Sequence, residues 1–350
     1  MTIKHSRARH IMAASGGLIS RSQLLDAGMS PLDIKHLVRA GQLAIVRRGI
    51  YVDGELWQEA DERHERHRIR TRAAIRLMNR GFVVSHDSSA HEHGMDILLP
   101  KDPHVHITRP GFTSAWTQSG VKHHLAGFVD EQVIEVNGLP VFDLARTAVD
   151  IAREHEEPFG LAACDSALRL GVPKQALYDA VAPMRNWPHV KRARSAVDLS
   201  DPGAQTIAES LGRDLVLDLG IGLKIETQFP VQLDDGRVVW LDIVVGCHAF
   251  EVDGKIKYTP VGEGGVAERP IQEVVWAEKK RERDLHGQRL GTSRIIWEDY
   301  WPGQRPAALR RLRAEYDDTT ARFGDQLPER LVRNAREIRS QTKPPGQRSA

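Results

Sequence analysis

The hydrophobic positions of the 350-residue chain repeat differently in three successive stretches. Up to residue 54, short apolar runs separated by Gly and Ser predict three short helices followed by a two-stranded hairpin. Residues 55–81 are highly charged but carry an apolar side, which predicts one amphipathic helix with Ile69, Ala73, Ile75 and Leu77 on that side. The following residues alternate between short strands such as "FVVSH" and helices such as "DLARTAVDIAREH". This middle stretch is therefore predicted to be a mixed α/β domain.

The last stretch follows a segment, residues 185–203, that we interpret as a linker because it closes with Asp, Pro and Gly. Its pattern predicts a helix, a strand, a hairpin, a long helix, a strand and a final helix, the first five over residues 204–219, 224–229, 237–252, 271–289 and 293–297. Beyond Asp325 the composition predicts a disordered end. We expect an α/β multidomain protein with domains at 1–54, 55–200 and 201–310, and a C-terminal helix and basic tail at 311–350.

The first stretch carries the signals of two capped helices. Ser20 is the predicted N-cap of a helix that Gly28 terminates. Ser30 is the predicted N-cap of the next helix, with Pro31 at its first position. The apolar residues expected to face inward are Leu24, Leu25, Leu32, Ile34, Leu37 and Val38. Two short strands around Arg47, Arg48 and Gly49 complete the stretch.

Three helices followed by a hairpin are the layout of a winged helix-turn-helix, which places its third helix in the major groove and its wing on the phosphates. The candidate contacts to double-stranded DNA are Ser30, Asp33, Lys35, His36, Arg39, Arg47 and Arg48. Winged helices also mediate protein contacts, so a protein-binding or structural role stays open. Charge favours a polyanionic partner, because residues 1–54 hold eight Lys or Arg against three acids, and residues 327–350 hold six against two.

The segment "GGLISRSQLLDAGMSPLDIKHLVRAGQLAIVRRGIYV", with the residues just before it, resembles the N-terminal domain of AbiEi-type antitoxins of type IV toxin–antitoxin systems. The resemblance covers roughly residues 7 to 54. It implies a winged helix that recognises operator DNA and represses transcription of its own operon, with a cognate toxin as a partner. The middle stretches "VVSHDSSAHEHGM" and "GLPVFDLARTAVDIARE" are similar to those that follow this domain in actinobacterial relatives, but imply no chemistry.

The remaining composition excludes several classes of protein. Hydrophobic and charged contents of 41% and 27% are those of a folded globular chain. The two cysteines, Cys164 and Cys247, match no metal or redox spacing, which predicts a reduced, cytoplasmic protein. The sequence has no signal-peptide core and no uncharged apolar run long enough to span a membrane. We expect no membrane partner, and the pattern leaves the oligomeric state open.

Acidic residues cluster in the hairpin of the last stretch, "LDIVVGCHAFEVDGK". If the loop between its strands has an even number of residues, for instance 246–249, Val244 stands opposite Glu251 and Asp242 opposite Asp253. Because side chains alternate between the faces of a strand, Asp242, Glu251 and Asp253 then share one face. A loop of odd length would put Asp242 on the other face.

Carboxylates that share a face need a counter-ion, and Mg²⁺ is the natural one because it prefers oxygen ligands and keeps water for chemistry. The predicted metal ligands are Asp242, Glu251 and Asp253, and Lys255 is a candidate to orient the water. Glu209 completes the candidate catalytic set. We expect it in the middle of its helix, on the turn nearest the sheet, if Ile207, Leu211 and Leu215 face inward. On the long helix, Lys279 and Arg283 are candidate phosphate contacts.

Residues 201 to 300 resemble the PD-(D/E)xK nuclease superfamily, most of all its very-short-patch-repair-like branch. The resemblance lies in "AES", "LDIVV", "EVDGK" and "EKKRERD", and implies a restriction-endonuclease-like domain with an Mg²⁺-dependent deoxyribonuclease site. The sequence departs from the Glu-x-Lys pattern of the superfamily, because Asp253 stands where lysine is usual and lysine appears only at 255. This departure puts cleavage in doubt, and nuclease folds also serve as inert binding platforms.

Two functions therefore stay open. The first is a DNA-binding regulator related to antitoxins, whose nuclease fold is a scaffold or a second DNA contact. The second is an endonuclease that the winged helix targets to DNA. The histidines at 86, 91, 93, 104 and 106 match no zinc spacing, so we interpret them as surface or hydrogen-bonded residues, and the 123–124 pair as a weaker signal still.

Overall fold

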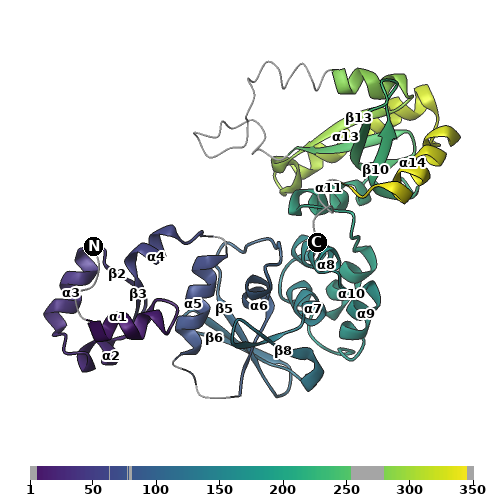
Figure 1. Ribbon diagram of the computed structural model, residues 1–350. Helices are drawn as coiled ribbons and strands as arrows, with labels where there is room; N and C mark the ends of the chain where they lie inside the picture. Colours follow the sequence, from purple (N-terminus) through teal and green to yellow (C-terminus); the bar gives the residue numbers. More distant parts are fainter. Residues whose placement is uncertain (1–5, 63, 77, 79–80, 254–279, 345–350) are drawn as a thin grey trace. The chain divides into compact units, whose positions relative to one another are not determined.

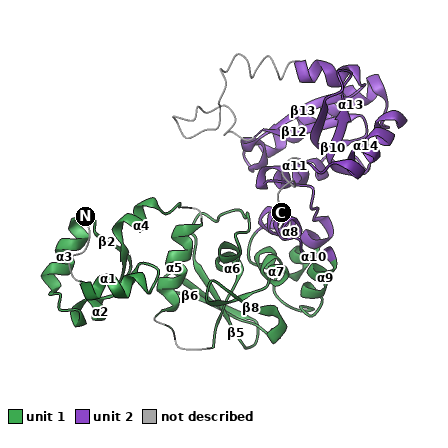
Figure 2. Cartoon of the chain, in the orientation of Figure 1, with its two compact units in different colours: residues 1–155, 175–194 green, residues 156–174, 195–350 purple. Residues whose placement is uncertain are grey.

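The computed structural model is shown in Figure 1 and describes residues 6–62, 64–76, 78, 81–253 and 280–344. The chain forms two compact units, coloured separately in Figure 2. Unit 1 comprises residues 1–155 and 175–194, and unit 2 comprises residues 156–174 and 195–350. Both units mix helices and strands, which confirms the α/β class. Within the described residues, no helix is long and apolar enough to cross a lipid bilayer.

The N-terminal part of unit 1 contains three short helices and a small antiparallel sheet. Its elements are α1 (Ser6–Ala13), β1 (Leu18–Ser20), α2 (Arg21–Asp26), α3 (Pro31–Arg39), β2 (Leu43–Arg47) and β3 (Ile50–Asp53). The strand order is β1-β3-β2, so β2 and β3 form the predicted hairpin. Ser20 and Ser30 are N-caps, as predicted, and the structure gives each of them a complete capping box. Ile19, Leu24 and Ile34 contribute to the core between the helices and the sheet.

The predicted inward positions of this part were only partly right. Leu24 and Ile34 are buried, but Leu25 is 40% exposed and Leu32 is 60% exposed. Helix α2 has six residues and α3 has nine, so each turns only one narrow stripe toward the core. Leu37 and Val38 are partly buried at the edge of that stripe.

A second correction concerns the single helix predicted over residues 55–81, because the described residues there contain two helices. Helix α4 (Gly54–Glu59) ends at Ala60, whose backbone is extended, and α5 (Glu65–Ile75) begins after the intervening turn. Ile69 and Ala73 are buried as predicted and pack against Leu18 and Ile50. Leu77 lies outside the described residues.

The remainder of unit 1 is built on a mixed six-stranded sheet with the order β6-β7-β5-β4-β9-β8. The strands are β4 (Val83–Val84), β5 (Val105–Arg109), β6 (Ser114–Gln118), β7 (Val121–Leu125), β8 (Val133–Val136) and β9 (Leu139–Phe142). Strand β5 is parallel to β7, and β4 is parallel to β9. The sequence pattern predicted β4, β5, β8 and β9 but missed β6 and β7. Helix α6 (His86–His93) packs on β5 and on α7 (Leu144–Glu154).

The segment interpreted as a linker is helical over most of its length. Helix α9 (Lys174–Val181) precedes it, and α10 (Val190–Leu199) occupies its second half and continues from unit 1 into unit 2. Ala193 and Val197 of α10 are fully buried. Burial of this apolar stripe stabilises a helix whose basic residues suggested a solvated connection.

Unit 2 contains a four-stranded sheet with helices packed on it. Its elements are α8 (Glu157–Arg169), α11 (Ile207–Leu217), β10 (Ile225–Gln232), β11 (Val238–Val245), β12 (His248–Asp253), β13 (Gly291–Ile296), α13 (Arg305–Phe323) and α14 (Glu329–Gln341). The order is β10-β11-β12-β13, in which only β13 is parallel to its neighbour. Residues 280–287 are also helical. The order from α11 to α13 follows the prediction, although residues 271–279 of the predicted long helix lie outside the described residues.

Helix α11 packs closely on the sheet of unit 2. Ile207, Leu211 and Leu215 are buried, as predicted. A Cβ atom added to Gly212 would lie 2.7 Å from a methyl carbon of Val252, so only glycine allows this approach without a shift. Glu209, however, lies in the first turn of α11, not in the middle of the helix.

The C-terminal tail is more ordered than predicted. Helix α14 occupies residues that the composition assigned to a basic tail, and it packs on β10. Leu331 and Ala335 are buried in the same core cluster as Phe229 and Leu241. These two apolar side chains are four residues apart and therefore lie on one side of the helix, facing the sheet.

Candidate functional site

The first candidate site is the exposed face of α3 and the hairpin formed by β2 and β3. Lys35, His36 and Arg39 are exposed on α3, Arg48 is exposed in the hairpin, and Arg47 is partly exposed. These residues offer positive charge and hydrogen-bond donors on two neighbouring elements of one small domain. Such a surface suits a polyanion.

Ser30 and Asp33 have a structural task at the start of α3. The Ser30 hydroxyl donates to the Asp33 carboxylate at 2.7 Å, and the Asp33 amide donates back to the Ser30 hydroxyl at 3.2 Å. The Ser30 amide also donates to Asp33, at 2.8 Å. These bonds fix the helix terminus and so hold the exposed basic residues of α3 in place.

The second candidate site surrounds the acidic hairpin of unit 2. Its turn has two residues, Gly246 and Cys247, because Val245 pairs with His248 and Val244 pairs with Ala249. The loop is therefore even, as the shared-face hypothesis required, but the predicted pairing of Val244 with Glu251 is wrong. Gly246 has a φ of +54°, which favours a tight turn over the longer loop suggested as an example.

Asp242 and Glu209 lie close together where α11 begins. The Asp242 carboxylate accepts a hydrogen bond from the Val252 amide at 2.9 Å, just beyond the last paired residues of β11 and β12. Burial, and then the negative charge of Asp242, raise the pKa of Glu209 from 4.5 to about 7. Hydrogen bonds from the Gln205 amide and the Thr206 hydroxyl oppose this rise.

Glu251 and Asp253 are paired with arginines. Arg281 donates to Glu251 at 2.9 Å, and Arg294 donates to Asp253 at 2.7 Å. A cavity of about 250 Å³ lies beside these two ion pairs. An incoming cation would have to compete with the arginines for the carboxylates, whereas an incoming phosphate would bind to the arginines.

The three predicted metal ligands do not form a preassembled site among the described residues. Asp242, Glu251 and Asp253 are not within mutual reach of one ion there, whereas three buried histidines of unit 1 are. Two of the predicted residues, Lys255 and Lys279, lie outside the described residues. Arg283 is exposed on the helical residues 280–287.

The sequence reasoning missed two residues beside Glu209. The side-chain amide of Gln228 donates to the Glu209 carboxylate at 3.0 Å, and the backbone of Gln228 has a φ of +46°. Burial raises the pKa of Tyr300, and the charges of Asp299, Asp242, Glu209 and Asp253 raise it further. The buried Tyr300 hydroxyl has no hydrogen-bond partner within the described residues. No spacing rule in the sequence singles out either residue.

Comparison with known proteins finds a family that the N-terminal part resembles. Residues 7–52 match the family model described as "Transcriptional regulator, AbiEi antitoxin". The N-terminal domain is therefore similar to AbiEi antitoxin regulators. The match covers α1 to β3 and includes the basic face of α3 and the hairpin.

Other matches extend over longer parts of the chain. The uncharacterised proteins MT2308 and Rv2248 of Mycobacterium tuberculosis are each 29% identical over 139 residues, which is 39% of this chain. The chain covers 50% of the length of these relatives. The crystal structure of the RV2827C protein from Mycobacterium tuberculosis aligns with a TM-score of 0.36 and 19% identity, over 55% of this chain and 75% of that chain.

Proposed function

We propose that this protein is a DNA-binding transcriptional regulator of the antitoxin type, whose N-terminal domain is a winged helix-turn-helix. The match of residues 7–52 to the AbiEi antitoxin family carries the proposal. The order of helices and strands supports it, since a three-helix unit followed by a β-hairpin is the architecture that lays one helix in the major groove.

In this proposal α3 reads the bases and the hairpin binds the backbone. Lys35, His36 and Arg39 are exposed on α3 and carry the donors that base edges in the major groove accept. Arg47 and Arg48 neutralise phosphates and set the register. By analogy with the family, the target is the operator of the protein's own operon, and a toxin encoded beside it is the partner.

A salt titration tests this assignment. Fluorescence anisotropy with the upstream duplex should show that Arg47→Ala with Arg48→Ala weakens binding and reduces the salt slope by roughly two, about one for each lost phosphate contact. The matched control is Arg333→Ala with Arg336→Ala, which removes two exposed charges from α14. Equal affinity and slope in the wing variant and the wild type would refute the proposed role of the wing.

Base reading has a separate signature. Arg39→Ala should lower the ratio of specific to non-specific affinity, because one bidentate base contact discriminates by about 1–3 kcal/mol. If Arg39→Ala loses the same factor of affinity for the specific and for the random duplex, Arg39 contacts a phosphate instead of a base.

A second candidate function is an Mg²⁺-dependent nuclease in unit 2, and the closeness of Glu209 to Asp242 favours it. Two neighbouring carboxylates, one of which (Glu209) has a raised pKa, fit a cation, and Glu251 would join them if Arg281 turned to a phosphate. Bound Mg²⁺ would supply an activated water. Asp242 and Glu251 would hold the ion, and Arg281 and Arg294 would bind the DNA backbone.

Plasmid nicking distinguishes the two candidates. A nuclease should nick supercoiled DNA with Mg²⁺, and Asp242→Asn and Glu251→Gln should abolish nicking without changing operator affinity. Nicking that persists in both variants would come from another site or a contaminant. If the wild type does not nick DNA but binds the operator in a salt-dependent manner, only the regulator function is supported.

A further inference from the structure

Three histidines that are far apart in sequence meet inside the six-stranded domain of unit 1. His86 is the first residue of α6, His106 lies in β5 and His124 lies in β7. Their exposed fractions are 3%, 2% and 7%, so all three imidazoles are removed from bulk water. Of the residues that the structure describes, these alone form a set of metal-ligating side chains whose ligand atoms all lie within 4.8 Å of one another.

The register of the sheet brings two of these histidines together. The parallel pairing aligns His106 with Lys122 and Thr108 with His124, so His106 and His124 are on the same face of β5 and β7. His106 Nδ1 lies 3.0 Å from His124 Nε2. Two nitrogens bound to one tetrahedral Zn²⁺ are ~3.3 Å apart, because each Zn–N bond is about 2.0–2.1 Å long. Only a small displacement would separate this pair enough to admit an ion.

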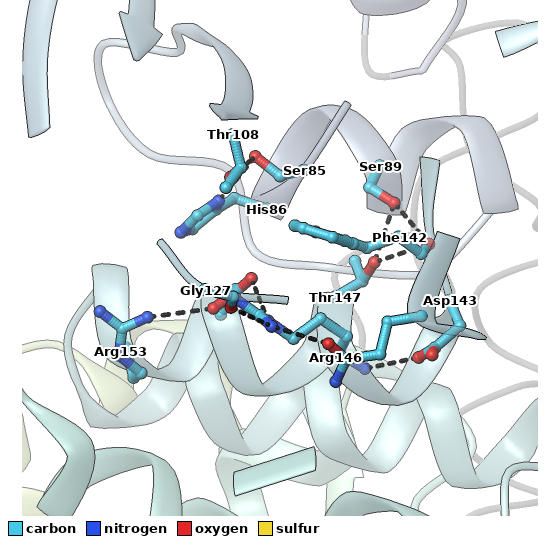
Figure 3. A network of polar contacts seen from close by, with 12 residues as sticks. Ser85, His86, Ser89, Thr108, Gly127, Phe142, Asp143, Arg146, Thr147 and Arg153 are labelled. Carbon is cyan, nitrogen blue, oxygen red and sulfur yellow. Dashed lines mark hydrogen bonds and ion pairs between the residues drawn. The ribbon is translucent and has the colours of Figure 1, made fainter. Parts of the chain in front are cut away.

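The backbone at His86 is also unusual. His86 has a φ of +48°, a conformation that costs a residue other than glycine about 1–3 kcal/mol. Its Nδ1 shares a hydrogen bond with the Ser85 hydroxyl at 3.0 Å, and Thr108 donates to Ser85 at 2.9 Å, as Figure 3 shows. This anchoring of one ring nitrogen orients the imidazole and so places the other ring nitrogen.

A buried carboxylate supports the cluster from behind. Asp87 Oδ2 lies 3.7 Å from His106 Nε2, the nitrogen on the far side of the ring from His124. Asp87 also bonds to His155 Nε2 at 2.9 Å through both of its oxygens. A carboxylate behind a histidine is the usual support of a metal-bound imidazole, because it orients the ring and raises the basicity of the ligand.

Burial disfavours the charged form of all three imidazoles. Burial lowers the pKa of His86 well below its ordinary value, and burial lowers that of His106 to about 3. Burial also lowers the pKa of His124 strongly. The rings of His86 and His124 are stacked, with their centroids 3.8 Å apart. Of the nearby cations, Lys122 pairs with Glu154, and Arg153 and Arg146 share Asp150.

We propose that His86, His106 and His124 form a binding site for a divalent transition-metal ion, with Zn²⁺ as the preferred ion. Three neutral imidazoles suit Zn²⁺ and leave one position for water. The ion would join α6, β5 and β7 inside the domain. This proposal is independent of DNA binding and of the acidic site in unit 2.

Metal uptake by the full-length protein tests the proposal. Metal-free protein should bind one Zn²⁺ per chain in calorimetry, and Zn²⁺ should raise the thermal midpoint. His106→Gln and His124→Gln should lose this uptake, and Asp87→Asn should weaken it by about 10–100-fold. The matched control is His104→Gln, just before β5, because the His104 side chain lies outside the cluster and 4.0 Å from Asp102.

The outcomes separate clearly. Absence of equimolar Zn²⁺ uptake and of any stabilisation in the wild type would overturn the proposal. Undiminished uptake by a folded His124→Gln variant would also overturn it. If the variants do not fold, X-ray absorption on the Zn²⁺-loaded wild type decides: scattering from three imidazoles supports the site, and a shell dominated by carboxylate oxygens contradicts it.

Discussion

Glu209→Gln gives the sharpest test of the acidic site in unit 2. Burial, and then the charge of Asp242, hold the pKa of Glu209 at about 7, above its ordinary value of 4.5. A carboxyl group whose pKa is raised by folding stabilises the folded state below its unfolded pKa. That contribution is lost as the pH rises through the folded pKa. The wild type should therefore lose stability between pH 4.5 and pH 7, and the glutamine variant should not lose this part.

The magnitude follows from the two pKa values. A rise from 4.5 to about 7 corresponds to ~3 kcal/mol of differential stability between the acidic and the neutral end of this window. For a unit of roughly 150–250 residues, ~3 kcal/mol changes Tm by about 6–12 °C. Glutamine keeps an acceptor for the Gln205 amide and the Gln228 side chain, so the substitution mainly removes the charge.

Differential scanning calorimetry of the wild type and Glu209→Gln, from about pH 4.5 to about pH 8, measures the effect. Groups that titrate independently of Glu209 contribute equally to both proteins, so the difference in Tm isolates this carboxyl. The Tm of the variant minus the Tm of the wild type should increase as the pH rises. Because the chain has two compact units, the transition that the substitution moves identifies unit 2.

Magnesium provides a second arm of the same experiment. An ion held by Glu209 and Asp242 would offset their repulsion, so Mg²⁺ should raise the Tm of the wild type at about pH 8 more than that of the variant. A difference in Tm that stays constant with pH would refute the electrostatic reasoning about Glu209. Equal Mg²⁺ responses in the two proteins would refute the metal site alone.

Two further predictions concern stability. Asp165→Ala should cost about 3–5 kcal/mol in denaturant unfolding, because it leaves buried Arg213, now bound to both Asp165 oxygens at 2.8 Å, without its partner. Asp165→Ala with Arg213→Met should recover most of that loss, and a double variant as unstable as the single one would show that packing, not charge, is at fault. Ser30→Ala should lower the stability of the N-terminal domain by ~1 kcal/mol in thermal unfolding, through loss of the α3 cap. Unchanged stability would mean that the cap contributes nothing in this context.

Local signals in the sequence predicted much of the fold. Capping residues and turn glycines act within a few residues, so the starts of α2 and α3 were found at Ser20 and Ser30. The α/β order of unit 2 was also readable, because its strands and helices have distinct apolar periods. Strand geometry predicted the hairpin, but the sequence left open whether its loop is even, and the register suggested as an example was wrong.

The errors share a physical cause. Leu25 and Leu32 are apolar and lie on helices, but which stripe is buried depends on where the neighbouring elements pack. Strand β6 is exposed along its whole length, so it has no alternating pattern to detect. Helix α10 is a basic segment that becomes helical because Ala193 and Val197 find a core. In each case the packing partner is distant in sequence.

The sequence by itself determined the types of the elements, their caps and the basic face of α3, because these depend on residues in one turn or one strand. Tertiary structure decided which charged groups meet. Arg281 and Arg294 pair with Glu251 and Asp253 only because separate elements converge on β12. In the same way His86, His106 and His124 come together because β7 pairs in parallel with β5 and α6 packs on β5, an arrangement that no spacing along the chain encodes.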